Sequence, residues 1–132
     1  MPGHSETIRV RSVVGRYLEH SRIFHFENGG STEVFVSSAD WMHRNFDRRI
    51  EIVFPIEDER IKARLTDEIL ASALLDDSNV RLLRSDGTHE RPRGGFNCHD
   101  VLEQIAAGTR HSFSLPPRET VKPRPSAAPA AP

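Results

Sequence analysis

The chain has 132 residues, a formal net charge of −1 at neutral pH and one cysteine. The length fits one small domain, and a single cysteine excludes an internal disulfide and any site built on several thiolates. No apolar run approaches the roughly 18 residues that a membrane-spanning helix needs, and the N-terminus lacks a signal or transit pattern. We therefore expect a soluble, cytoplasmic protein that meets membranes at most peripherally, as part of a larger enzyme.

Composition divides the chain into two parts. Residues 1–107 hold the expected domain, whereas residues 108–132 are rich in proline and alanine and predict a disordered tail. A domain of this size buries about 60 to 65% of its unfolded surface, so its stability is expected to be marginal. A domain of such marginal stability is compatible with stabilisation by a partner.

The first half of the domain is rich in β-forming residues. Ile8 and Val10 alternate with arginines, which suits a strand with one buried face. Asn28-Gly29-Gly30 predicts the turn of a hairpin between two further strands. The expected elements are a strand over 7–14, a short helical turn over 15–19, and strands over 21–26 and 33–37.

The second half mixes helices and strands. The clearest helix covers 58–75, where apolar residues recur every four positions and acids occupy the first turn, and it is expected to pack on a sheet. Together the elements indicate an α/β (α+β) fold. The others are a turn or short helix over 39–45, a strand over 48–54, a hairpin of 78–84 with 88–92, and a helix over 97–107.

Candidate chemistry is concentrated between His20 and Glu51. His20 and Arg22 are two positions apart on an expected strand, so both can face one site. A histidine near neutral pH can accept a proton, donate one or neutralise a phosphoryl oxygen. The alternatives are a surface or structural histidine and a solvated strand arginine.

A run of arginines follows. Arg44, Arg48 and Arg49 flank Asp47, and guanidinium groups bind phosphate in a bidentate manner. The alternative is a solvated face with internal ion pairs, and the binding interpretation gains weight if Ser38 and the arginines converge on His20. Ser37 and Ser38 either donate hydroxyls to a phosphate or bond the adjacent turn.

Glu51 and Trp41 each allow two interpretations. Glu51 either orients His20 through its second ring nitrogen or pairs with a neighbouring arginine, and Trp41 either anchors a turn or stacks on a base. Phosphate-cradling glycine loops, a zinc-type spacing of the seven histidines and a Ser-His-Asp arrangement are all missing from the sequence. No protein-bound metal is therefore expected.

The order of these motifs resembles a known half-site. His-x-Arg, then Ser-Ser-Ala-Asp-Trp, then Arg-Asn-x-Asp-x-Arg-x-Glu is similar to the phospholipase D superfamily pattern of His-x-Lys, Gly-Ser-Ala-Asn-aromatic and a later Glu. More narrowly, residues 8–22, 26–30 and 37–51 resemble the C-terminal end of bacterial polyphosphate kinase, and this resemblance covers about residues 2–107.

The resemblance implies a partial phospholipase D-like domain with a mixed β-sheet. The family reversibly transfers the terminal phosphate of ATP to inorganic polyphosphate, with Mg²⁺ and through a phosphohistidine, at a site shared by two such domains. His20 matches the second domain's histidine, which assists the transfer, and Arg49 matches an arginine near the nucleotide phosphates. Arg22, Ser38 and Glu51 match the frame of the half-site, and Arg44 is grouped with the phosphate-binding residues.

The departures from the family shape the expected function. The chain lacks the family's first domain, its phosphorylated histidine and its N-terminal modules, so we expect a fragment that is inactive alone. Expected partners are ATP or ADP, polyphosphate, the remaining part of the kinase if it is encoded separately, and copies of itself in a homo-oligomer. One alternative is a non-catalytic remnant that binds polyphosphate or nucleic acid; another is a self-pairing nuclease or lipase, which would require lysine at Arg22.

Overall fold

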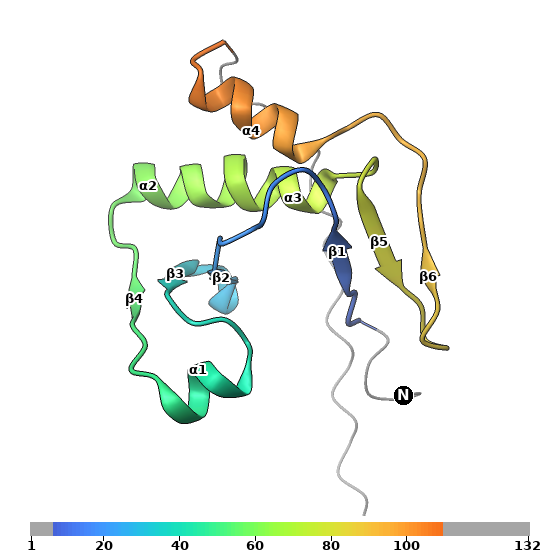
Figure 1. The fold of residues 1–132 in the computed structure, drawn as a ribbon. Coiled ribbons are helices and arrows are strands. Elements are labelled where there is room, and N and C mark those ends of the chain that lie inside the picture. Colours follow the sequence, from blue (N-terminus) through green and yellow to red (C-terminus); the bar gives the residue numbers. More distant parts are fainter. Residues whose placement is uncertain (1–6, 110–132) are drawn as a thin grey trace, which may run out of the picture.

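The computed structural model describes residues 7–109, which form six short strands and a set of helices (Figure 1). In the first half lie β1 (Arg11–Val13), β2 (Ile23–Phe26), the 3₁₀ turn η1 (Asn28–Gly30), β3 (Glu33–Ser37), α1 (His43–Arg48) and β4 (Val53–Pro55). In the second half lie α2 (Glu59–Ala63), η2 (Arg64–Leu70), α3 (Ala71–Leu75), β5 (Val80–Leu83), β6 (His89–Glu90) and α4 (Cys98–Ala106).

The strands form two three-stranded sheets. Sheet A has the order β1-β5-β6 and sheet B the order β2-β3-β4. Every recorded strand pair is antiparallel, so the described residues contain two small antiparallel sheets in place of the expected mixed sheet. Both predicted hairpins are confirmed: β2 pairs with β3 and β5 pairs with β6.

One long helix lies across both sheets. It runs from Glu59 to Leu75 through α2, η2 and α3, and its middle part, η2, is π-helical. Asp58 caps its start, because its side chain accepts hydrogen bonds from the backbone N–H groups of Arg60 and Ile61. The predicted helix over 58–75 is therefore confirmed to within one residue. α4 packs on the side of this helix that faces away from the sheets (Figure 1).

A buried carboxylate joins the end of α3 to β5 and α4. Asp76 has no exposed surface, and its Oδ1 accepts from Asn79 N at 2.7 Å while its Oδ2 accepts from Cys98 N at 2.9 Å. Burial acts to raise the pKa of Asp76, but these donors outweigh it and hold the pKa below its ordinary value. The buried side chains of this part of the core are Ala71, Ser72, Val80, Cys98 and Val101, and the core continues to Val34 of β3 and Ala39.

The sequence predictions are wrong mainly in the segments that connect the strands and helices. Residues 15–17 form a bend and no helical turn is found over 15–19, and β4 begins only at Val53 where a strand over 48–54 was expected. The predicted turn or short helix over 39–45 is found as the short helix α1, shifted to His43–Arg48. The predicted tail, apart from Gly108 and Thr109, lies outside the described residues. Within residues 7–109 no helix is long and apolar enough to cross a membrane.

Candidate functional site

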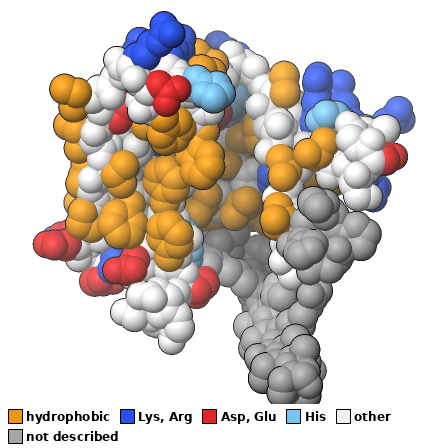
Figure 2. Space-filling view, turned by 90° about the horizontal axis from the view of Figure 1, so that it is seen from below, with side chains coloured by type: hydrophobic (Ala, Val, Ile, Leu, Met, Phe, Trp, Pro, Cys, Tyr) orange, Lys and Arg blue, Asp and Glu red, His pale blue; other side chains and the backbone are white. Residues whose placement is uncertain are grey.

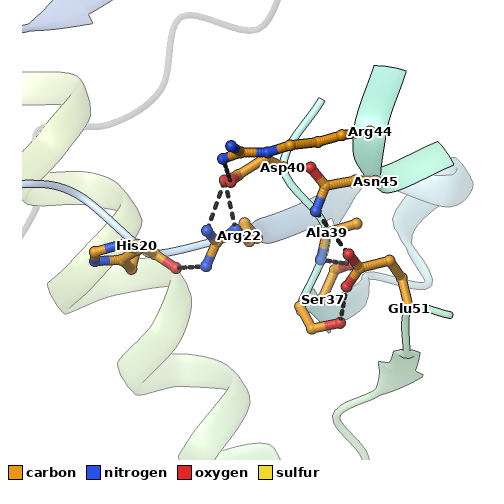
Figure 3. Close-up of polar contacts among 9 residues, drawn as sticks. His20, Arg22, Ser37, Ala39, Asp40, Arg44, Asn45 and Glu51 are labelled. Carbon is orange, nitrogen blue, oxygen red and sulfur yellow. Dashed lines mark hydrogen bonds and ion pairs between the residues drawn. The ribbon is translucent and has the colours of Figure 1, made fainter. Parts of the chain in front are cut away.

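The sequence candidates come together where β3 ends. The segment before β2 brings His20 and Arg22, the loop after β3 brings Ser38, and α1 with its following residues brings Arg44, Arg49 and Glu51. Figure 3 shows that the side chains fall into two polar clusters, one around Arg22 and one around Glu51.

The Arg22 cluster is an ion pair with Asp40. Arg22 Nε and Nη2 donate to Asp40 Oδ1 at 2.9 and 2.6 Å, and Arg22 Nη1 donates to the carbonyl oxygen of His20 at 2.7 Å. The hydrogen bond from Arg22 is the main reason that the pKa of Asp40 lies below its ordinary value. Only 20% of the Arg22 side chain is exposed, so its guanidinium is fixed in place.

The Glu51 cluster holds a serine and an asparagine. Ser38 Oγ donates to Glu51 Oε2 at 2.5 Å, and Asn45 Nδ2 donates to Glu51 Oε1 at 2.6 Å. Ser38 Oγ also accepts from Ile52 N at 3.1 Å, which ties the loop after β3 to the residues before β4. The Ser38 hydrogen bond, followed by that of Asn45, lowers the pKa of Glu51, so the group stays a carboxylate at neutral pH.

Both predicted roles of Glu51 therefore need correction. Its two oxygens are taken by Ser38 and Asn45, and within the described chain it forms neither a hydrogen bond to His20 nor an ion pair with an arginine. The nearby charges of Arg49 and Arg22 act on it only at longer range. Ser37 bonds the adjacent turn, since its Oγ accepts from Ala39 N at 3.0 Å.

His20 lies at the edge of this arrangement. Its side chain is exposed, and Figure 3 shows its ring pointing away from the contact between Arg22 and Asp40. The expected common direction of His20 and Arg22 is not found, because both residues precede β2 and strand alternation does not apply to them. His20 is thus free to meet a group that approaches from outside this chain.

The arginines of α1 do not pair with Asp47. That carboxylate contacts His43, with 3.3 Å between Oδ2 and Nδ1. Arg44 is 60% exposed and only 3.9 Å from Asp40, whereas Arg48 and Arg49 are exposed and form no recorded hydrogen bond or ion pair within residues 7–109. The predicted internal ion pairs therefore account for Arg44 alone.

Trp41 contacts two aromatic rings of the same region. Its ring centroid lies 6.4 Å from that of Phe24 and 6.2 Å from that of Phe46, yet the residue is 81% exposed. These contacts favour the turn-anchoring interpretation, while the exposed face of the indole remains open to a partner.

His99 of α4 holds the segment that leads to His20. Tyr17 N donates to His99 Nδ1 at 3.3 Å, so the other nitrogen, Nε2, carries the proton and donates to Glu19 Oε1 at 2.6 Å. Gly15 lies so close that a Cβ there would be 2.6 Å from the His99 ring. We call this arrangement the His99 latch; it fixes the backbone on the N-terminal side of His20.

The His99 latch also brings together three residue types that can bind metals, but both ring nitrogens of His99 already have hydrogen-bond partners. The ligand atoms of Glu19, Cys98 and His99 lie within 4.8 Å of one another. Both His99 nitrogens are already engaged, and burial, with the neighbouring Asp76, raises the pKa of Cys98 to about 12. In the described chain the recorded hydrogen bonds of His99 to Tyr17 and Glu19 give this cluster a structural role.

Sequence reasoning missed two members of the site. Asp40 and Asn45 stand inside the quoted motifs, but only the structure shows that one fixes Arg22 and the other fixes Glu51. Asn45 is 3% exposed, and its Oδ1 has no hydrogen-bond partner in the described chain. Buried polar atoms are normally hydrogen-bonded, so this oxygen is a group for which the described chain supplies no donor.

Comparisons with known proteins identify the family. Residues 1–98 match the family model described as polyphosphate kinase C-terminal domain 2. A polyphosphate kinase of Paraburkholderia phytofirmans is 53% identical over 99 residues, which cover 75% of this chain and 14% of that protein. A polyphosphate kinase of Pseudomonas aeruginosa is 43% identical over 113 residues, or 81% of this chain and 16% of that protein.

A solved structure agrees. The crystal structure of polyphosphate kinase from Porphyromonas gingivalis matches with a TM-score of 0.70 and 36% identity, over 80% of this chain and 17% of that one. The fold is accordingly phospholipase D-like, and the chain spans about one sixth of the length of these relatives. This chain belongs to the polyphosphate kinase family and corresponds to its second C-terminal domain.

Proposed function

We propose that this chain supplies one half of a polyphosphate kinase active site, at which the terminal phosphate of ATP is transferred reversibly to inorganic polyphosphate. The observation that carries the proposal is that the Arg22–Asp40 pair and the Glu51 cluster lie together where β3 ends in sheet B. The exposed His20, Arg44 and Arg49 border these two clusters. In this proposal His20 assists the transfer and the phosphorylated histidine belongs to the other half.

The charges suit such a division of labour. Arg22 is neutralised by Asp40 and holds the backbone carbonyl of His20, so it positions the histidine. Arg44 and Arg49 are exposed and available to phosphate oxygens, to which a guanidinium can make two parallel hydrogen bonds. Phosphoryl transfer depends mainly on positioning and on fixed positive charge around the moving group.

Magnesium would arrive with the nucleotide. The carboxylates of the site both accept hydrogen bonds from the protein, Asp40 through Oδ1 and Glu51 through both oxygens. They therefore serve to orient Arg22, Ser38 and Asn45, and Mg²⁺ bound to the ATP phosphates would screen the negative charge that the arginines also face.

An exposed apolar surface lies next to the candidate site. Large apolar side chains around α1 and β4 are unusually exposed, and Figure 2 shows hydrophobic side chains gathered over this end of the molecule. Monomeric proteins rarely leave a contiguous apolar patch of this kind uncovered. We propose that the remaining part of a polyphosphate kinase covers it. We call it the apolar face, made of Trp41, Met42, Phe46, Ile50, Ile52, Val53 and Phe54.

A chimera tests the proposed function. This chain replaces the matching segment of the P. aeruginosa relative, and growth of polyphosphate from labelled ATP is measured. His20→Gln and Arg49→Gln should each lower the rate, by about 100-fold or more for His20, the lower end of what positioned proton transfer contributes. The matched control is Arg60→Gln on α2, an exposed arginine away from the site, which should leave the rate unchanged.

Two results would reject the proposal. One is a folded chimera that makes no polyphosphate although the parent enzyme does. The other is an active chimera in which His20→Gln behaves like Arg60→Gln, because His20 would then have no part in the transfer.

The second candidate function is a non-catalytic anion-binding module for polyphosphate or nucleic acid. The exposure of Arg44, Arg48 and Arg49 favours it. Binding measured against salt concentration separates the two candidates: purely electrostatic binding should hardly respond to His20→Gln, whereas binding to a shaped half-site should weaken.

A further inference from the structure

A second basic surface lies on sheet A, away from the candidate site. Ser12, Val14, Arg81, His89 and Arg91 line an open depression of about 470 Å³. Figure 2 shows basic side chains and a histidine gathered over the end of the molecule that carries β5 and β6, opposite the end with α1 and β4 in Figure 1.

Strand register explains how these residues come together. Ser12 of β1 is opposite Arg81 of β5, and Leu83 of β5 is opposite His89 of β6. Because side chains alternate between faces, Ser12, Arg81, His89 and Arg91 share the outer face of the sheet. The buried neighbour Val80 points to the core face.

The two faces of sheet A differ in how their charged side chains are paired. Glu90 alternates with His89 and Arg91, and on its side of the sheet it forms an ion pair with Arg84. On the outer face no carboxylate lines the depression, and Arg81 and Arg91 form no recorded hydrogen bond or ion pair within the described chain. Like charges on neighbouring strands repel, and an anion between them would remove that repulsion.

We propose that this depression binds a stretch of inorganic polyphosphate, with Arg81 and Arg91 as bidentate ligands of its phosphate oxygens, Ser12 as a hydroxyl donor and His89 as a further donor. No Phe, Tyr or Trp side chain lines the depression, so it lacks the large aromatic rings on which single-stranded nucleic acid stacks most strongly. The choice of polyphosphate among phosphate-rich ligands rests on the proposed function; the depression would hold the chain at a distance from the reacting end.

Binding of a short labelled inorganic polyphosphate to the full chain tests this inference. The variant R81Q/R91Q removes two charges from the depression, and the matched control R60Q/R64Q removes two charges from the α2 end of the long helix. Arg81→Gln and Arg91→Gln break no recorded contact, so thermal unfolding of R81Q/R91Q should stay close to that of the parent. We expect about 10-fold weaker binding and a shallower salt dependence for R81Q/R91Q, and less than about 2-fold weakening for the control.

Three results would overturn the inference: no binding of polyphosphate by the parent chain, equal weakening in the two double variants, or tighter binding of single-stranded RNA that R81Q/R91Q abolishes. The variant R44Q/R49Q keeps this test separate from the proposed function. If R44Q/R49Q weakens binding and R81Q/R91Q does not, the second site is rejected while the candidate active site stands.

Discussion

The two ends of the molecule are built in opposite ways. Around Asp76 the side chains are closed off from water: Val80, Ser72 and Cys98 have no exposed surface, and the carboxylate has its donors within the chain. Around α1 and β4 the apolar side chains face outward, and Ile50 is fully exposed. The closed end therefore makes the fold, whereas the open end has the composition of an interior without the cover.

The polar groups follow the same division. At the closed end the Asp76 carboxylate accepts from two segments, the turn at Ser78 and Asn79 and the start of α4 at Cys98. At the open end His20, Arg44 and Arg49 are exposed, and Asn45 Oδ1 lacks a partner within the described residues. The exposed apolar side chains and the polar groups without partners in the described chain therefore lie in the same region. This coincidence is what the proposed shared active site requires, since in that proposal the second half buries the apolar face and completes the phosphate site together.

The largest effect should come from breaking the closed end. Asp76→Ala leaves the backbone N–H groups of Cys98 and Asn79 buried without acceptors, and each such loss costs about 1 to 3 kcal/mol. We expect a loss of about 3 to 5 kcal/mol in urea unfolding. The control is Asp67→Ala, at an exposed acid of the long helix. Equal stabilities for the two variants would show that Asp76 does not hold the end of α3, β5 and α4 together.

Opening the His99 latch should have the next largest effect. His99→Ala removes a buried ring that accepts from Tyr17 N and donates to Glu19, with an expected cost of about 1 to 3 kcal/mol. Hydrogen exchange should then accelerate at Tyr17 and through to His20. Gly15→Ala should act in the same direction, because its new Cβ would meet the ring; unchanged exchange in both variants would argue against the latch.

A smaller effect is expected from the pH response of Glu51. Its pKa in the folded chain lies below the ordinary value, so its stabilising contribution is present above the unfolded pKa and is lost as pH falls through the folded one. The stability difference between the parent and Glu51→Gln should therefore vanish in acid. Carboxyl titration by NMR gives the pKa directly, and a value at or above that of a free glutamate would refute the cluster.

The smallest effect on stability should follow from polar substitution in the apolar face. Ile50→Ser and Ile52→Ser remove side chains that are already exposed, so each should change the unfolding free energy by no more than about 0.5 kcal/mol. Solubility should rise, and in the chimera the assembly with the other half should weaken. Clear destabilisation of the isolated chain would mean that this face is already covered.

Local signals in the sequence predicted the elements that depend on neighbouring residues. The helix over 58–75 follows from its four-residue apolar spacing and its Asp58 cap, and both hairpins follow from their turns. The residues after α1 were misassigned because Ile50 and Ile52 alternate like those of a half-buried strand, yet both are exposed. An apolar alternation indicates a face suited to burial, but it does not show whether the described chain itself covers that face.

Long-range partners explain the remaining errors at the site. Arg22 turns toward Asp40, 18 residues away, and Glu19 meets His99, 80 residues away. Neither segment contains a local sequence signal for a partner so far away in the chain. Residue types alone could place Arg22, Ser38 and Glu51 in one region, but not assign Glu51 to Ser38 and Asn45 in preference to His20.

One measurement tests the central claim most directly. The purified chain is incubated with Mg²⁺ and ATP labelled on its terminal phosphate, and both acid-labile phosphohistidine and polyphosphate growth are followed. The proposed half-site should give neither product, because in this proposal the opposing positive charge and the phosphorylated histidine belong to the other half. Accumulation of phosphohistidine together with chain growth by this chain alone would contradict the account.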